Sequence, residues 1–166
     1  MSPSVYVAIP IMLLLAIVQT AVLPYFPIFG LTPQLPFLVA LAWALLRGED
    51  EGVLWAFVAG LFLDLFSIIP VGVTSLSYMI GIFAIIWIQR AFSSSRFFLT
   101  IILAVLSTLI SLLVYIFLLR IFGYMDDFSI AASLPTVSLL HGGLILPIYW
   151  VMYRIDRSIR PRRVQI

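Results

Sequence analysis

The stretch FFLTIILAVLSTLISLLVYIFLLRIF, residues 97–122, has no charged side chain before Arg120. A helix of this length, rising roughly 1.5 Å per residue, exceeds the ~30 Å hydrocarbon core of a bilayer, so we expect it to cross a membrane with some tilt. Of the 166 residues, 64% are hydrophobic and 10% are charged. With a mean hydropathy of +1.23, the chain has too much apolar surface for a soluble domain of this size. The sequence therefore predicts an all-α, polytopic integral membrane helical bundle.

Five more apolar stretches surround this segment and fill nearly the whole chain. We predict six transmembrane helices in a single domain over residues 1–166, which ends in a basic tail at residues 154–166. Their approximate bounds are residues 4–23, 33–46, 52–69, 73–89, 97–122 and 134–153. The second stretch is the shortest, so a tilted or partly re-entrant helix inside the bundle is the alternative there. The first stretch lacks the basic segment of a signal peptide and is expected to remain as a helix.

The nine basic residues are all arginines, and their distribution indicates the orientation of the chain. Cytoplasmic segments close to a membrane are enriched in Arg and Lys. Six helices with the N-terminus inside leave only Arg120 in an outer loop and place the others in cytoplasmic segments: Arg47, Arg90, Arg96, Arg154, Arg157, Arg160, Arg162 and Arg163. A five-helix arrangement breaks this bias. We therefore expect both termini to lie in the cytoplasm.

Two charged segments lie at the predicted membrane boundary. Glu49, Asp50 and Glu51 precede the third helix, where acidic side chains suit the positive end of the helix dipole, and a partner-binding site is the alternative. The arginines of the tail are expected to anchor the chain to anionic membrane lipid, with contact to a cytoplasmic protein as the alternative: Arg154, Arg157, Arg160, Arg162 and Arg163.

Asp64 is the one charged residue well inside a predicted helix, and a charge within the hydrocarbon is costly without a partner. It ends a ridge of residues spaced four apart, which share one helix face and let a neighbouring helix approach closely: Gly52, Ala56, Gly60 and Asp64. We expect this ridge to turn Asp64 into the bundle. Candidate partners for its carboxylate are His141 and Arg120, with Ser75, Ser77 and Tyr78 as neutral alternatives. A packing contact is the main expectation, and a proton or ligand relay and a partner contact are the alternatives.

His141, the single histidine, is followed by Gly142 and Gly143, and Pro147 comes one turn later. Two glycines thin a helix and permit close packing or a bend, so these residues are expected to serve helix packing or partner interaction. The chain has no cysteine. It also offers no nucleophile with a base, no phosphate loop and no metal-ligand spacing. We therefore predict no enzymatic activity, no metal and no cofactor.

The segment from Gly60-Leu61-Phe62-Leu63-Asp64-Leu65 through Pro70-Val71-Gly72 to Tyr78 and Gly81 resembles the rod shape-determining protein MreD family. The resemblance covers residues 31–90 well, while the first, fifth and sixth helices agree mainly in hydropathy. The family has no assigned catalytic residues, so Gly60, Asp64 and Gly72 are taken as structural or interaction residues.

This resemblance implies a membrane scaffold in the cell-elongation and peptidoglycan-synthesis machinery of the bacterial cytoplasmic membrane. The implied partners are MreC, a RodA-type polymerase with its penicillin-binding transpeptidase and, further off, MreB. Membrane lipid surrounds the chain, and no nucleic acid is expected to bind.

The main rival function is that of a substrate-binding subunit of a small-molecule transporter. Six helices in a chain of this length are similar to the S components of energy-coupling transporters, and the two could share a fold. Such a subunit predicts a ligand-sized cavity lined by polar groups, for which the chain offers Asp64, Tyr78, Arg120, His141 and Trp150. An intramembrane enzyme is the third class, and one aspartate with one histidine gives it little support.

Overall fold

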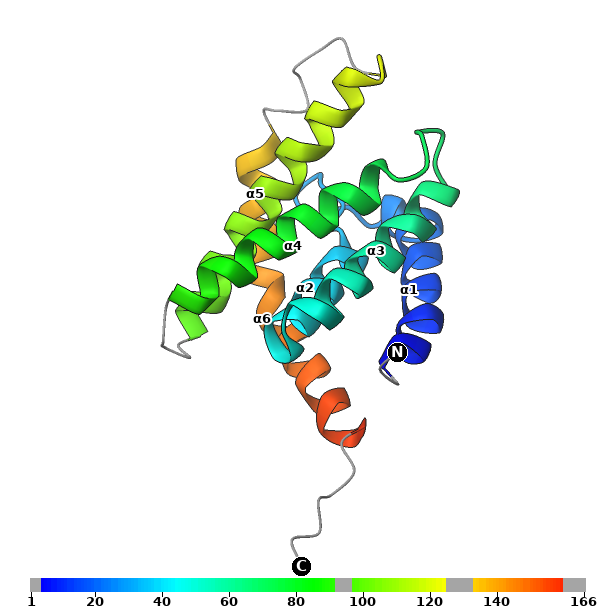
Figure 1. The fold of residues 1–166 in the computed structure, drawn as a ribbon. Helices are drawn as coiled ribbons and strands as arrows, with labels where there is room; N and C mark the ends of the chain where they lie inside the picture. Colours follow the sequence, from blue (N-terminus) through cyan, green and yellow to red (C-terminus); the bar gives the residue numbers. More distant parts are fainter. Residues whose placement is uncertain (1–3, 92–96, 125–132, 160–166) are drawn as a thin grey trace, which may run out of the picture.

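The computed structural model describes residues 4–91, 97–124 and 133–159. In these residues the chain forms six α-helices, packed as a bundle (Figure 1). Their bounds are α1 Ser4–Ala21, α2 Leu35–Arg47, α3 Glu49–Leu65, α4 Val73–Ala91, α5 Phe97–Ile121 and α6 Leu134–Ile159. A short 3₁₀ helix, η1 Leu23–Tyr25, follows α1. The predicted all-α fold and the six helices are thereby confirmed.

Four of these helices are long and apolar enough to cross a membrane: α1, α4, α5 and α6. The matching segments are Tyr6–Tyr25, Val73–Arg90, Phe98–Ile121 and Leu134–Ser158. The other two helices are shorter, with 13 residues in α2 and 17 in α3. The chain is thus a polytopic membrane protein in which α2 and α3 are shorter than the four helices that are long enough to cross the membrane.

The shortest helix, α2, forms the centre of the core. Nine of its residues, Pro36 to Ala44, are buried, and α2 contacts each of the other five helices. The remaining helices pack mainly on their neighbours in sequence: α3 on α4, α4 on α5 and α5 on α6, while α1 lies on α3. Because α2 is surrounded by protein, its apolar side chains serve the core rather than contact with lipid.

The boundaries of two helices, α3 and α6, differ from the sequence-based expectations. The acidic residues Glu49, Asp50 and Glu51 form the first turn of α3 instead of preceding it, because Gly48, at a φ of 92°, separates this helix from α2. Helix α3 then ends at Leu65, four residues before the expected boundary at Ile69. At the other end of the chain, α6 passes through Pro147 and continues to Ile159. Arg154 and Arg157 therefore lie in a helix, whereas Arg96, Arg160, Arg162 and Arg163 fall outside the described residues.

The helix ends that carry most of the described arginines gather on one side of the bundle. In Figure 1 the α2–α3 junction and the C-terminal ends of α4 and α6 lie toward the bottom, and the α3–α4 turn and the C-terminal end of α5 lie toward the top. Arg47, Arg90 and Arg157 belong to the last turns of α2, α4 and α6, while Arg120 belongs to the last turn of α5. We call the lower side the basic end.

Candidate functional site

The carboxylate of Asp64 binds the beginning of the next helix. It accepts hydrogen bonds from the backbone N–H groups of Gly72 at 2.8 Å, Thr74 at 3.1 Å and Ser75 at 3.4 Å. Only 1% of Asp64 is exposed. The unpaired N–H groups and the positive dipole at the N-terminus of α4 offset the charge that burial would otherwise penalise. Gly72 has a φ of 106°, a backbone conformation that favours glycine, and this conformation brings its N–H group to the carboxylate. Asp64 therefore fixes the turn between α3 and α4.

The ridge of α3 residues that ends at Asp64 is buried throughout and meets two different helices. A Cβ atom added to Gly52 would lie 2.2 Å from the Cβ atom of Ala44 in α2. A Cβ atom added to Gly60 would lie 2.3 Å from the Cα atom of Ser75 in α4. Ala56, between the two glycines, is fully buried. One face of α3 thus approaches α2 near the basic end and α4 near the opposite end.

His141 does not contact Asp64 and instead joins α6 to α5 and to the start of α2. Its Nε2 atom accepts the backbone N–H group of Gln34 at 2.9 Å, so the proton of the neutral ring lies on Nδ1. Nδ1 is 3.0 Å from the Thr108 hydroxyl, which itself donates to the carbonyl of Ala104 at 2.8 Å. The ring is fully buried. Both nitrogens are therefore occupied in fixing the positions of three helices.

The remaining predicted glycines have different surroundings. Gly81 in α4 faces α5, where an added Cβ atom would lie 2.7 Å from the Cβ atom of Ser111. Gly142 also faces α5, at 2.8 Å from a side-chain methyl group of Val105. An added Cβ atom on Gly143 would have no atom within 4 Å, because this glycine lies on the outside of α6. The glycine pair of α6 therefore has one member in a helix contact and one on the surface.

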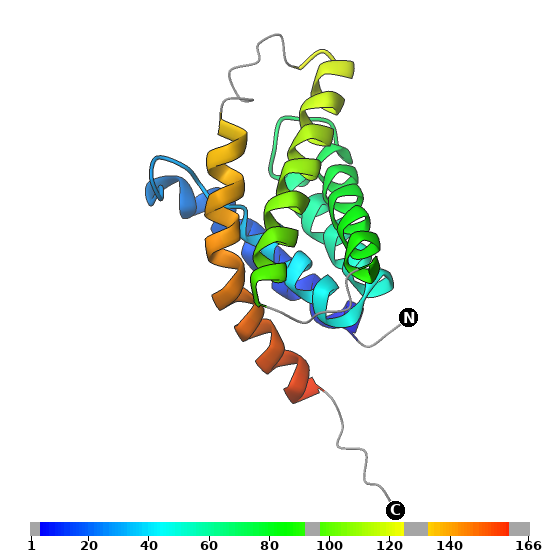
Figure 2. The same cartoon turned by 90° about the vertical axis from the view of Figure 1, so that its left-hand side faces the viewer.

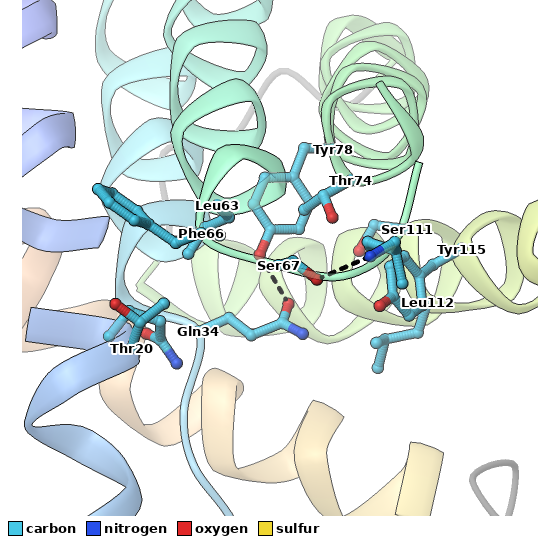
Figure 3. Close-up of a pocket in the computed structure, with 12 residues that line it drawn as sticks. Thr20, Gln34, Leu63, Phe66, Ser67, Thr74, Tyr78, Ser111, Leu112 and Tyr115 are labelled. Atoms are coloured by element: carbon cyan, nitrogen blue, oxygen red, sulfur yellow. Dashed lines mark hydrogen bonds between the residues drawn. The ribbon is translucent and has the colours of Figure 1, made fainter. Parts of the chain in front are cut away.

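A cavity of about 280 Å³ lies on the side of the bundle away from the basic end, between the end of α1, the start of α2 and helices α3 to α5 (Figure 3). Its lining is uncharged, and its polar residues are Gln19, Thr20, Gln34, Ser67, Thr74, Tyr78, Ser111 and Tyr115. The Tyr78 hydroxyl donates to the side-chain oxygen of Gln34 at 3.3 Å. Such a lining suits a neutral group that forms hydrogen bonds.

Of the residues suggested for a transporter cavity, only Tyr78 lines this one; Asp64, Arg120, His141 and Trp150 do not. The sequence reasoning did not identify the other polar groups of this cavity. Gln19 and Gln34 could have been noticed as amides at the ends of predicted helices, but the sequence does not reveal that the two ends meet.

The basic end is held together by charged and aromatic contacts that the sequence analysis did not anticipate. Arg47 of α2 forms an ion pair with Asp156 of α6, and Arg90 of α4 forms one with Glu49 of α3 at 2.7 Å. The indole N–H of Trp43 donates to Glu51 at 2.9 Å. The same indole ring stacks on that of Trp55, with 4.5 Å between the ring centroids. Two of the three acidic residues in the first turn of α3, Glu49 and Glu51, thus bond to other side chains of this protein.

Within the part of the chain that the structure describes, no three His, Cys, Asp or Glu residues are grouped so that they could hold a metal ion. Asp64 and His141 each bond to backbone and side-chain groups of neighbouring segments. The geometry is therefore that of helix-to-helix contacts, with the uncharged cavity described above beside them.

Comparisons with known proteins give one finding. No curated protein and no solved structure matches the chain, so the likeness to the S components of energy-coupling transporters stays a prediction. The family described as rod shape-determining protein MreD matches residues 2–158. Because this match spans nearly the whole sequence, including the Asp64 turn and both contacts of His141, the chain belongs to the MreD family.

Proposed function

We propose that this protein is a non-catalytic scaffold subunit of the cell-elongation machinery, held in the bacterial cytoplasmic membrane with both termini inside. Membership in the MreD family implies a role in rod-shape determination. The scaffold role itself, its partners and its orientation are our inference. The arginine distribution supports the orientation, since the basic end carries Arg47, Arg90, Arg154 and Arg157.

One observation carries the proposal: the buried side chains of Asp64 and His141 are engaged in joining helices. Asp64 accepts backbone N–H groups of α4, and both ring nitrogens of His141 are occupied. A general acid or base needs a free position from which it can reach a substrate. A scaffold needs a fixed shape, which such contacts provide.

We propose that the small residues of the ridge and of the other helix contacts give the bundle this shape. They are Gly52, Ala56, Gly60, Gly81 and Gly142, together with Asp64, His141 and Gly72, whose N–H group bonds to Asp64. Gly143, on the outside of α6, is a candidate for contact with a partner helix, because a glycine lets a second helix approach closely. The proposed partners are MreC and, with it, a RodA-type polymerase and its transpeptidase, with MreB as a further candidate on the cytoplasmic side.

The test is recovery of partners from native membranes. A tagged chain is extracted in mild detergent, and the proteins that accompany it are identified by mass spectrometry. Recovery of MreC and the polymerase complex supports the scaffold. The matched variants are Gly60→Leu, which disturbs an internal contact, and Gly143→Leu, which alters only the outer surface of α6. Loss of partners in Gly143→Leu at a normal protein level would assign that surface to a partner.

The cavity favours a second candidate function, the binding of a small neutral molecule. A volume of about 280 Å³ is near the lower end of the range of ligand sites, roughly 300–1,000 Å³. Solvent extraction of the purified protein followed by mass spectrometry tests for a stoichiometric compound. The transporter function is favoured over the scaffold by two results together. A compound is present in the parent and lost in Tyr115→Leu, and neither MreC nor the polymerase is in the preparation.

A further inference from the structure

Two pairs of an aromatic and an arginine side chain lie along one exposed face of the C-terminal part of α6. The guanidinium carbon of Arg154 lies 4.7 Å from the ring centroid of Trp150, and that of Arg157 lies 5.1 Å from the ring centroid of Tyr153. These residues recur at intervals of three and four, so they share one side of the helix. Trp150 is 58% exposed and Tyr153 is 38% exposed. We call these four residues the arginine–aromatic stripe.

The opposite side of the same helical segment faces the protein. Met152 and Asp156 are each 2% exposed, and Asp156 pairs with Arg47 of α2. This ion pair fixes the rotation of α6 about its axis. The stripe is therefore held outward by a contact on the other side of the helix.

The arginines of the stripe differ from the other arginines of the basic end. Arg47 and Arg90 are each paired with a carboxylate of this chain. Arg154 and Arg157 form no ion pair with any residue among those described, and both are exposed. Two positive charges, each lying over an aromatic ring, thus remain available to a ligand outside the protein.

The position of the stripe points to the membrane boundary. It occupies the end of the apolar segment Leu134–Ser158, and Figure 2 shows that this part of α6 continues beyond the lower ends of the neighbouring helices. Tryptophan and tyrosine are enriched where a helix passes from hydrocarbon to head groups. Arginine side chains at such a boundary lay their apolar stems along the helix and hold the guanidinium at the level of the head groups.

We propose that the arginine–aromatic stripe is a binding site for the phosphate groups of anionic phospholipids. A guanidinium presents a planar set of N–H donors that matches phosphate oxygens, and the ring beneath it leaves one face and the N–H edges open. Two such groups on one face favour a lipid with net negative charge. A zwitterionic lipid also carries a cation, which the arginines repel. The rings of Trp150 and Tyr153 lie where the glycerol and upper acyl region of the same lipid would be.

Native mass spectrometry of the purified full chain in neutral detergent tests this site. Phosphatidylglycerol and phosphatidylcholine of equal chain length are added at matched concentrations, and the bound lipid per protein is measured. The parent is expected to retain several-fold more phosphatidylglycerol than phosphatidylcholine. In the double variant Arg154→Gln/Arg157→Gln, the amount of phosphatidylglycerol bound per protein is expected to fall at least about threefold. Arg120→Gln, at the other end of the bundle, is the matched control and should behave as the parent.

The substitution of lysine at both positions separates charge from geometry. Arg154→Lys/Arg157→Lys keeps both charges and removes the planar groups over the rings, so its phosphatidylglycerol retention should lie between those of the parent and the glutamine variant. Equal retention of the two lipids by the parent overturns the proposal. Unchanged phosphatidylglycerol retention in the glutamine variant also overturns it. If this variant then fails to recover an acidic partner protein from native membranes, the stripe is a protein contact instead.

Discussion

Gly60 and Ser75 touch backbone to backbone: a Cβ atom added to Gly60 would lie 2.3 Å from the Cα atom of Ser75 and 2.4 Å from its nitrogen. Neither atom belongs to a flexible side chain, so α3 and α4 can accept a larger residue only by moving apart. Overpacking a well-packed interior costs about 1–3 kcal/mol, and a backbone clash should fall at or above the upper end of this range. We expect Gly60→Ala to lower the apparent melting temperature in detergent clearly.

Gly143→Ala is the control for this substitution. The added methyl group has no atom within 4 Å, and alanine is favoured over glycine inside a helix by about 1 kcal/mol. Its melting temperature should be equal to or higher than that of the parent. An equal response of the two variants would contradict the close contact at Gly60.

The cap at Asp64 predicts a graded response to substitution. Asp64→Asn keeps one side-chain oxygen and loses the charge, so some of the bonds from Gly72 and Thr74 can persist. Asp64→Leu removes all of them and leaves several N–H groups at the start of α4 without an acceptor. Loss of a helix cap costs about 0.5–2 kcal/mol, and a buried unsatisfied donor costs about 1–3 kcal/mol.

We therefore expect stability to fall in the order parent, Asp64→Asn, Asp64→Leu, as measured by thermal melting. Gly60→Leu should disrupt stability and complex assembly more than Asp64→Asn, since a cap can rearrange and a backbone contact cannot. Normal protein levels and normal partner recovery in Gly60→Leu would refute this ranking.

Asp64 and His141 should act independently, because they have no partner in common among the described residues. His141→Phe leaves the backbone N–H group of Gln34 without its acceptor and should cost about 1–3 kcal/mol. Combined with Asp64→Asn, the two effects should add to within about 0.5 kcal/mol. A larger interaction energy in this double-mutant cycle, measured by denaturation, would indicate the direct coupling that the structure lacks.

The two ion pairs at the basic end should differ in strength. The side chain of Asp156 is 3% exposed and that of Arg47 is 25% exposed, whereas Arg90 and Glu49 are 55% and 27% exposed. Removing one member of a buried pair costs up to about 3–5 kcal/mol, and an exposed pair contributes about 0–1 kcal/mol.

Arg47→Met should therefore lower the melting temperature more than Arg90→Met. This difference in melting temperature should persist in 0.5 M salt, because salt screens a buried ion pair only weakly. Thermal scans at low and high salt check both statements. If the melting temperature falls equally in the two variants, the ion pair between Arg47 and Asp156 contributes no more stability than the exposed pair.

The sequence was sufficient for the fold class, the six helices and the family, because apolar stretches and their breaks are local signals. For Asp64 it offered one of the actual donors, Ser75, whose backbone N–H and hydroxyl groups both lie 3.4 Å from the carboxylate, but it missed the backbone N–H groups of Gly72 and Thr74. Reasoning from the sequence considered side chains as partners, first His141 and Arg120 of more distant helices and then the neutral groups of the next helix. The shortest of these bonds comes from the backbone N–H group of Gly72, eight residues further along the chain, and only the path of the turn brings the next helix start back to Asp64.

The cavity and the ion pair between Arg47 and Asp156 could not be predicted for a related reason. Gln19 and Tyr115 line the same cavity although they belong to different parts of the chain. Arg47 and Asp156 meet across 109 positions of sequence. Neither pair has a spacing that any periodic pattern would detect, because the bundle topology decides which helix ends become neighbours.

The small size of α2 has a consequence for how the protein is made. Its 13 residues extend roughly 20 Å at 1.5 Å per residue, which is less than the ~30 Å hydrocarbon core. An insertion machinery that recognises length and hydrophobicity has little reason to release such a segment into lipid alone. Because only Gly48 separates α2 from α3, we expect the two helices to leave the translocation channel together as a hairpin. We therefore expect the orientation of α2 and α3 in the membrane to be decided only after α3 has been synthesised.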